Sequence, residues 1–165
     1  MKKRMLGIGI ILFVLINTFA LGYEKASAKD DKVNHATFEE QIKNFGKKLT
    51  DKVPENYSRE DALENGDITP EHITQKQREK INQFMANVRN NKPDFIRFVQ
   101  FFPSGTLIKE YQFNGDLIYY RADSTRIKNS RDKVYTDYCK DLEKKTKPFE
   151  GTFLTNCYHS KSIEF

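Results

Sequence analysis

The sequence predicts an α+β domain in which N-terminal helices pack on one face of a four- to five-stranded antiparallel sheet. Apolar residues recur at helical spacing as far as residue 90, and from Phe95 onward the period changes to that of strands. Between two of these strands lies Asn114-Gly115, the strongest short-range signal for a β-hairpin. Nearer the C-terminus, the two cysteines of the chain, Cys139 and Cys157, predict one disulfide.

Residues 1–28 have the pattern of a secretory signal peptide. A basic start precedes an apolar stretch, and Ala26 and Ala28 form the small-x-small motif that a signal peptidase recognises. We therefore expect cleavage after Ala28, no membrane attachment afterwards, and a secreted or cell-wall-associated protein. The alternative is an uncleaved signal that anchors the protein, because the apolar residues 6–23 approach the length of a membrane span. Residues 1–28 contain no cysteine, so we expect no lipid anchor.

Most of the positive charge belongs to this first segment. The whole chain has a formal net charge of +5, to which residues 1–28 contribute four basic residues and one acidic residue. The exported part therefore keeps a net charge of about +2, without the clustered basic face that binds nucleic acid. Its length is that of one domain. We expect a flexible lead-in and a helix in residues 29–56, and the α+β domain in residues 57–165.

Two helices are predicted in the first part of the exported chain. The first begins at Thr37, which opens a capping-box pattern, and its apolar residues continue at helical spacing to Leu49. Gly46 within it costs about 1 kcal/mol relative to Ala. The second is short, with Ser58 as its N-cap and Gly66 as its C-terminal stop.

A third helix precedes the strands. It begins either at Thr69, which is followed by proline, or at Thr74, which forms a capping box with Gln77. One stripe of this helix is apolar, and a stripe of this kind is more often a core face than a partner-binding face. Its members are Ile81, Phe84, Met85 and Val88.

Five strands are predicted after the helices. The first has bulky groups on both sides, which indicates a central position with both faces covered. The second alternates, with Tyr111 and Phe113 on one face and Glu110 and Gln112 on the other. We expect a type I′ turn at Asn114-Gly115, with positive φ at both residues. The predicted strands are residues 95–102, 106–113, 116–122, 133–142 and 151–158.

The cysteines fall in the last two of these strands. In an oxidising compartment an even number of cysteines predicts a disulfide rather than free thiols. In the chain-entropy model, a bridge between Cys139 and Cys157 contributes roughly 3 kcal/mol. We therefore assign the pair a structural role.

The best candidate for a site is the polar loop 123–132. Arg126 and Arg131 could bind a carboxylate or phosphate in a forked geometry, and Asp123 and Asp132 could hold a hard cation. The spacing matches no EF-hand, so we expect no metal or cofactor. The structural interpretation is that the aspartates cap the backbone of the loop and pair with its arginines. The calcium alternative predicts a melting temperature that rises with added calcium.

The tyrosines give a second candidate for binding. If Tyr111 and Tyr119 share a solvent face, they form a patch of the kind found at interfaces. The alternative is that most tyrosines close the core, with their hydroxyl groups at its rim. No metal-ligand spacing, nucleophile elbow or phosphate-binding glycine loop is present in the sequence.

Two motifs carry a resemblance to a known family. Residues 57–67 read Tyr-Ser-x-x-Asp-Ala-x-x-Asn-Gly-Asp, and the loop at residues 123–132 is similar to an Asp-x-Ser-Arg-Asp pattern. In this chain Ser130, Arg131 and Asp132 follow Asp123 and Arg126 only after an insertion. Over residues 57–158 the chain resembles small exported proteins and lipoproteins of Bacillus-type Gram-positive bacteria, the family called domain of unknown function 4362. The resemblance implies location and domain extent and no activity.

Together these features favour a non-catalytic binding or interaction module that acts outside the membrane. Its partner would be an extracellular protein, which it could inhibit, or a small ligand. The alternative is a small extracellular hydrolase that uses dispersed acidic residues. An exposed aromatic patch on the sheet would favour the first, and two converging carboxyl groups with raised pKa in a pocket would favour the second.

Overall fold

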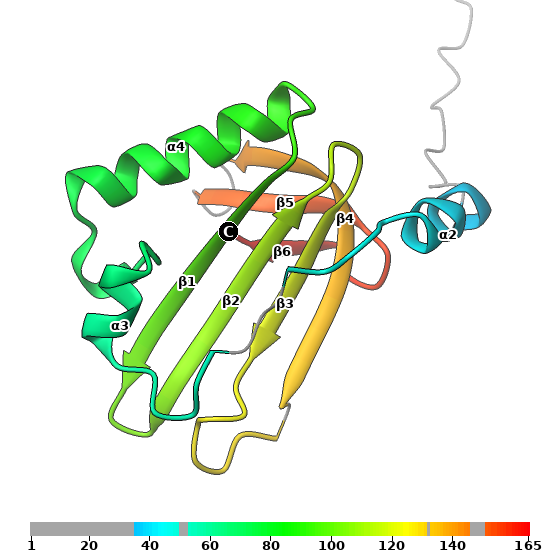
Figure 1. The fold of residues 1–165 in the computed structure, drawn as a ribbon. Helices are drawn as coiled ribbons and strands as arrows, with labels where there is room; N and C mark the ends of the chain where they lie inside the picture. Colours follow the sequence, from blue (N-terminus) through cyan, green and yellow to red (C-terminus); the bar gives the residue numbers. More distant parts are fainter. Residues whose placement is uncertain (1–34, 50–52, 132, 146–150) are drawn as a thin grey trace, which may run out of the picture. The chain divides into compact units, whose positions relative to one another are not determined.

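The computed structural model describes residues 35–49, 53–131, 133–145 and 151–165, and these residues belong to one compact unit (Figure 1). The predicted signal peptide and its cleavage site at Ala26 and Ala28 lie outside the described residues. Among the described residues, no helix is long and apolar enough to cross a membrane.

Six antiparallel strands form one sheet in which every strand pairs with the next along the chain. The sequence predicted four to five strands, and that count was wrong because the last strand has only three residues. The strands are β1 (Asp94–Phe102), β2 (Gly105–Phe113), β3 (Ile118–Asp123), β4 (Val134–Lys145), β5 (Gly151–Cys157) and β6 (Ser162–Glu164).

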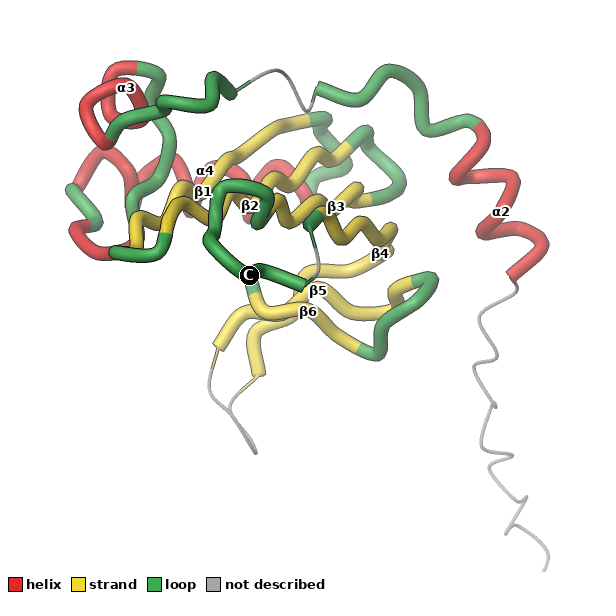
Figure 2. The backbone as a smooth tube through the Cα atoms, turned by 90° about the horizontal axis from the view of Figure 1, so that it is seen from below, coloured by secondary structure: helices red, strands yellow, loops and turns green. Residues whose placement is uncertain are grey.

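The sheet is curled, and its last strands fold over one face of its first three (Figures 1 and 2). The long strand β4 makes this possible, because its first half pairs with β3 and its second half pairs with β5. The two halves meet at the disulfide between Cys139 and Cys157, which confirms the predicted pairing. Beside it Asn156 has a positive φ of 53°, an irregularity of the kind that bends a strand.

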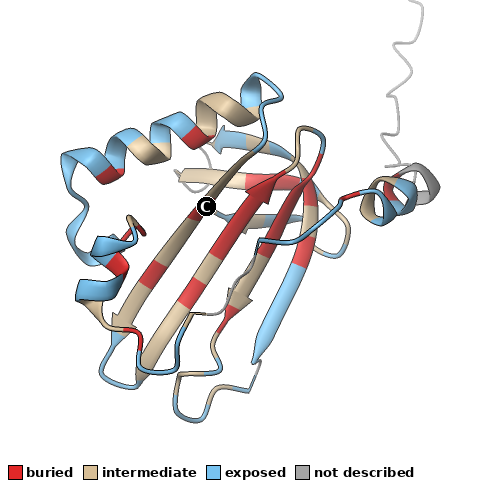
Figure 3. Ribbon diagram, in the orientation of Figure 1, coloured by how far each residue is buried: buried red, intermediate tan, exposed pale blue. Residues whose placement is uncertain are grey.

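The strand period gives the sheet two faces of different character. We call the face that bears Ile96, Tyr111 and Tyr120 the concave face, because the chain after β6 folds back onto it: the ring of Phe165 lies 4.9 Å from that of Tyr111. The opposite, convex face bears Glu110 and its cross-strand neighbours. Burial is concentrated in the second half of β2 and the first half of β3, next to the hairpin that joins them (Figure 3).

Helices pack on both faces, whereas the sequence predicted them on one. Helix α4 (Gln75–Arg89) places Phe84 in the core of the concave face. Helix α3 (Arg59–Glu64) packs Ala62 on the convex face, where α2 (His35–Lys43) also packs. The physical reason is that β1 and β2 carry apolar side chains on both faces, and each face needs cover.

Local signals placed α3 and α4 correctly. Ser58 and Thr74 are their N-caps, and both capping boxes are formed. The alternative start at Thr69 was wrong, because Pro70–His72 forms a separate 3-10 turn. Helix α2 ends at Lys43, so its predicted continuation to residue 49 was also wrong: Gly46 has a φ of +88°, which a helix does not allow.

Strand β1 lies at an edge of the sheet and is not central as predicted. Its outer side is nevertheless covered, because Ile68 forms a parallel bridge to it, with its N–H 2.8 Å from the carbonyl of Arg97. Glu71 accepts a further hydrogen bond from the N–H of Phe101 at 2.8 Å. Cover of this kind protects an edge from pairing with another chain.

The hairpin at Asn114 is present, but its turn differs from the predicted type I′. Only Gly115 has a positive φ, of 103°, and the strands close at the pair Phe113 and Ile118. The side chain of Asn114 accepts hydrogen bonds from the N–H groups of Asp116 and Leu117, so the connection has four residues.

Candidate functional site

A row of opposite charges crosses the convex face. The strand register sets Arg97 of β1 opposite Glu110 of β2, and Glu110 opposite Arg121 of β3. The carboxylate of Glu110 accepts from Arg97 Nε at 2.9 Å and from an Arg121 guanidinium nitrogen at 3.1 Å. The Glu110 side chain is 2% exposed, so this carboxylate is desolvated and bound by two guanidinium groups.

Both ends of the row continue into loops. At one end Arg97 lies 3.6 Å from the carboxylate of Asp67, which also accepts from the Tyr57 hydroxyl at 2.7 Å. At the other end Arg121 donates to Asp123 at 2.7 Å. Three carboxylates and three guanidinium groups thus form one balanced ion network, whose members are Asp67, Arg97, Glu110, Arg121, Asp123 and Arg126.

The network joins the two motifs that carry the family resemblance. Tyr57 and Asp67 belong to the first motif, and Asp123 and Arg126 belong to the second. Arg126 also donates to the carbonyl of Val53 at 2.5 Å, which fixes the loop to the segment before α3. These contacts have a structural role, because each of these charged groups forms an ion pair with another residue of the domain.

The predicted loop site divides accordingly. Asp123 is buried, and it accepts from the N–H and the hydroxyl of Thr125 at 2.9 and 2.6 Å, the self-capping arrangement of the structural interpretation. Burial opposes ionisation of Asp123, but the bonds from Thr125 and Arg121 outweigh it, and its pKa is lowered. Arg131 is exposed, and Asp132 lies outside the described residues. Of the predicted residues, the structure joins Asp123 and Arg126, at 3.3 Å.

The described residues contain one group whose side chains are close enough to hold a metal ion: Asp137, Cys139 and Cys157. Both sulfur atoms belong to the disulfide, so they are not available as ligands. Asp137 itself accepts four hydrogen bonds, including those from the N–H groups of His159 and Ser160 at 3.0 Å. It is a buried cap for the turn after β5.

Tyr111 and Tyr119 lie on opposite faces of the sheet, so they do not share the patch considered for them. Tyr111 pairs with Tyr120 on the concave face, and Tyr119 packs with Phe45 and Tyr138 on the convex face. Both are buried. Burial raises the pKa of Tyr119, and it raises that of Tyr111 further.

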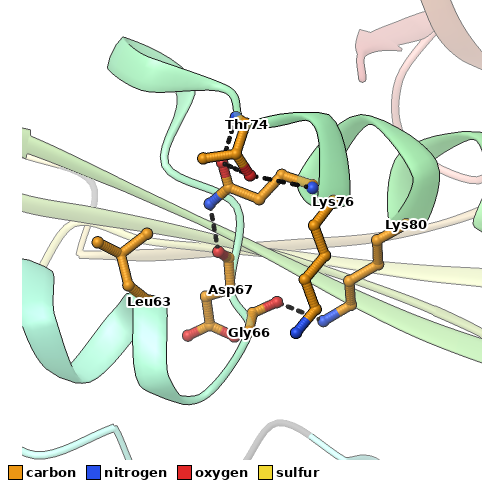
Figure 4. Close-up of a pocket in the computed structure, with 7 residues that line it drawn as sticks. Leu63, Gly66, Asp67, Thr74, Lys76 and Lys80 are labelled. Atoms are coloured by element: carbon orange, nitrogen blue, oxygen red, sulfur yellow. Dashed lines mark hydrogen bonds between the residues drawn. The ribbon is translucent and has the colours of Figure 1, made fainter.

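One cavity of about 340 Å³ lies between α3 and the start of α4 (Figure 4). The ammonium group of Lys80 donates to the carbonyl of Gly66 at 2.6 Å, and Gln77 donates to the carbonyl of Asp67 at 2.9 Å. Figure 4 shows Lys76 and Lys80 reaching the same side of the Gly66 turn. These contacts hold the turn at Gly66 against α4. The cavity is therefore a gap in the packing between α3 and α4.

A second cavity, of about 270 Å³, opens on the concave face, and we call it the concave-face pocket. Its aromatic walls come from β1, β2 and the chain after β6: Phe165 lies 5.5 Å from Phe98 and 4.9 Å from Tyr111, between ring centroids. Ile73 and Leu107 extend the apolar lining. Ile73 is 38% exposed, so the pocket is open to solvent.

Lys109 is the basic group of this pocket. The register places it between Phe98 and Ala122, in the middle of β2. It is half-buried, and it makes no hydrogen bond or ion pair with any residue that the structure describes. The arginines of the neighbouring strands, by contrast, point to the other face and are ion-paired.

Sequence reasoning missed the ion network and the pocket. Glu110 was correctly placed on the face opposite Tyr111, but its partners depend on the register of β2 with β1 and β3. No periodic pattern marks Phe165, because the strand before it has only three residues. A signal was available for the network: once the hairpin is closed, charged residues of alternating sign fall opposite one another on three strands.

The fold and the pocket define a small α+β domain built on a curled antiparallel sheet with an apolar pocket on its concave face. Residues 65–154 match the family described as domain of unknown function 4362, and this match covers more than half of the chain. The chain belongs to that family. All six members of the ion network lie within the matched residues. The curated proteins contain no match to this chain, and neither do the solved structures.

Proposed function

We propose that this protein is an exported, non-catalytic binding module that holds a small apolar ligand in the concave-face pocket. The observation that carries the proposal is an open aromatic pocket built on paired strands. Ligand sites are typically concave and mostly apolar, with a few polar groups that fix orientation. Here Phe98, Tyr111 and Phe165 supply the apolar walls, while Gln100 and Lys109 supply polar groups.

The size of the pocket limits the ligand. A cavity of about 150 Å³ is enough for benzene, and this one is about 270 Å³. One aromatic ring with a short substituent therefore fits within the pocket, whereas a lipid chain or an oligosaccharide would extend beyond it. At this size, an affinity near 1 mM or tighter is expected for a fragment of about ten non-hydrogen atoms.

The acidic residues favour binding over the hydrolase alternative. A general acid needs a carboxyl group with a raised pKa. Among the described residues, hydrogen bonds lower the pKa of the carboxyl groups of Asp61 and Asp123, which is the opposite direction. Glu110 is bound by two arginines and buried, so it cannot reach a substrate.

Export is part of the proposal and is supported by two features. Residues 1–28 have the signal-peptide pattern, and the disulfide between Cys139 and Cys157 is of the kind that persists in oxidising compartments. A Bacillus-type Gram-positive source and release from the cell or association with its wall belong to the same proposal. A secreted protein could also use the pocket by inserting one apolar side chain, which would make the module an inhibitor.

The test is a titration with indole and toluene, followed by amide NMR shifts. We expect saturable shifts for the amides of β1, β2 and Phe165. Leu107→Trp should fill the pocket and abolish them. The matched control is Leu63→Trp, which changes the cavity between α3 and α4 and should leave the shifts intact. Absence of saturable shifts, or equal shifts in the Leu107→Trp variant, would refute the proposal.

A further inference from the structure

We infer that the ligand of the concave-face pocket is an aromatic or short aliphatic carboxylate whose anionic group binds Lys109. This inference rests on the proposed function, because it names the chemical class of ligand for that site.

The position of Lys109 is the first argument. Its side chain leaves the sheet on the concave face between Phe98 and Ala122, two apolar cross-strand neighbours. A half-buried cation beside apolar groups loses part of its hydration, and an anion or hydrogen-bond acceptors can restore the lost free energy. The described residues provide it with neither. An anionic ligand would.

The polar groups around Lys109 give the ligand an orientation. Gln100 lies opposite Leu107, which makes it a diagonal neighbour of Lys109 on the same face. Its amide can donate to a second carboxylate oxygen. The Tyr111 hydroxyl is already used, because it donates to the carbonyl of Glu164 at 3.2 Å. The acidic end of a ligand would therefore lie over Lys109 and Gln100, with its apolar body towards Phe165.

Glu164 decides between a carboxylate and a phosphate. Glu164 also lines the pocket, and it forms no ion pair with Lys109 or with any other described residue. Lys109 attracts an anionic group, but Glu164 repels it, and this repulsion is larger for two negative charges than for one. A monoanion is therefore favoured over a dianion such as a phosphate monoester.

The experiment compares two probes of nearly the same shape, phenylacetate and phenylacetamide, by NMR titration at 50 mM salt. We expect wild type to bind phenylacetate about five- to tenfold more tightly. Lys109→Met keeps the apolar stem, so it should still bind phenylacetamide while losing the preference for the anion. Lys80→Met, at the other cavity, is the matched control and should keep the preference. Phenyl phosphate, as a third probe, should bind more weakly than phenylacetate.

The variant Glu164→Gln tests independently whether Glu164 repels an anionic ligand. Removing the repulsion should raise the affinity for phenylacetate a few-fold and leave that for phenylacetamide unchanged. The inference is overturned if phenylacetamide binds as tightly as phenylacetate in wild type, or if Lys109→Met keeps the preference. In either case binding of the neutral probe would leave the proposed function standing. If neither probe binds wild type, both the proposed function and the inference are overturned.

Discussion

Removal of Glu110 should be among the most destabilising single changes in this domain. Its carboxylate, 2% exposed, lies between Arg97 and Arg121, whose side chains are 13% and 22% exposed. In Glu110→Ala the ion network keeps three guanidinium groups and two carboxylates, so it carries one positive charge in excess, and Arg121 and Arg126 must share Asp123. Breaking a buried ion pair in this way costs about 3–5 kcal/mol, and the partial exposure of the arginines favours the lower end.

The assay is urea denaturation at pH 7. A loss of about 3 kcal/mol, with an m-value of about 2 kcal/mol per molar, lowers the midpoint by about 1.5 M. The matched control is Glu79→Ala, because Glu79 is exposed and bonded only to Gln75 among the described residues. Its free energy of unfolding should change by no more than about 0.5 kcal/mol. If Glu110→Ala leaves too little folded protein, Glu110→Gln, which keeps the shape and one acceptor, should give an intermediate loss.

A double variant tests the charge argument directly. Glu110→Gln combined with Arg121→Met leaves two matched pairs, Asp67 with Arg97 and Asp123 with Arg126. The double variant should lose less free energy of unfolding than the sum of the losses in the two single variants. Additive losses, or a loss below about 1 kcal/mol for Glu110→Ala, would show that the ion network is not held together as described.

Three further predictions concern the loops and the disulfide. The pKa of Asp123 is lowered in the folded state, so its ionised form stabilises the fold above its unfolded pKa near 4, and this contribution is lost as the pH falls through the lower folded value. Between pH 5 and pH 3 the urea midpoint should therefore fall less in Asp123→Asn than in wild type. Replacing Cys139 and Cys157 by serine should reduce the free energy of unfolding by about 3 kcal/mol, measured by the same denaturation, and an unchanged midpoint would contradict the structural role. Gly105→Ala should cost at least about 3 kcal/mol, because a Cβ there would lie 1.9 Å from the backbone carbonyl oxygen of Arg126. Gly46→Ala, with nothing within 4 Å of its Cβ, should cost only about 1 kcal/mol, and equal thermal shifts for the two variants would contradict this difference.

Local chemistry was enough to locate much of the fold. The capping boxes at Ser58 and Thr74 act within four residues, so α3 and α4 could be read directly from the sequence. Runs of strand-forming residues bounded by turn signals placed five of the six strands, and alternation in β2 set Glu110 and Tyr111 on opposite faces. The cysteines were paired correctly because the chain offers a single pairing. The family membership also followed from motifs in the sequence.

The register of the strands required the folded structure. A two-residue turn at Asn114 would have paired the strands two residues out of step, and the side chain of Asn114 set the four-residue connection instead. The shift preserves the faces, since the period is two, but it changes every cross-strand partner. The ion network could therefore not be derived before the hairpin was closed.

The concave-face pocket is a product of long-range packing. Strand β6 has three residues, too few for a periodic pattern, and Phe165 reaches β1 and β2 only because the sheet curls at the disulfide. The sequence determined which segments are helices and strands, because those preferences act between near neighbours. Only the tertiary structure decided which helix covers which face of the sheet and which charged residues meet. It also decided that Lys109 faces an open apolar pocket. All three features depend on contacts between residues far apart in the chain.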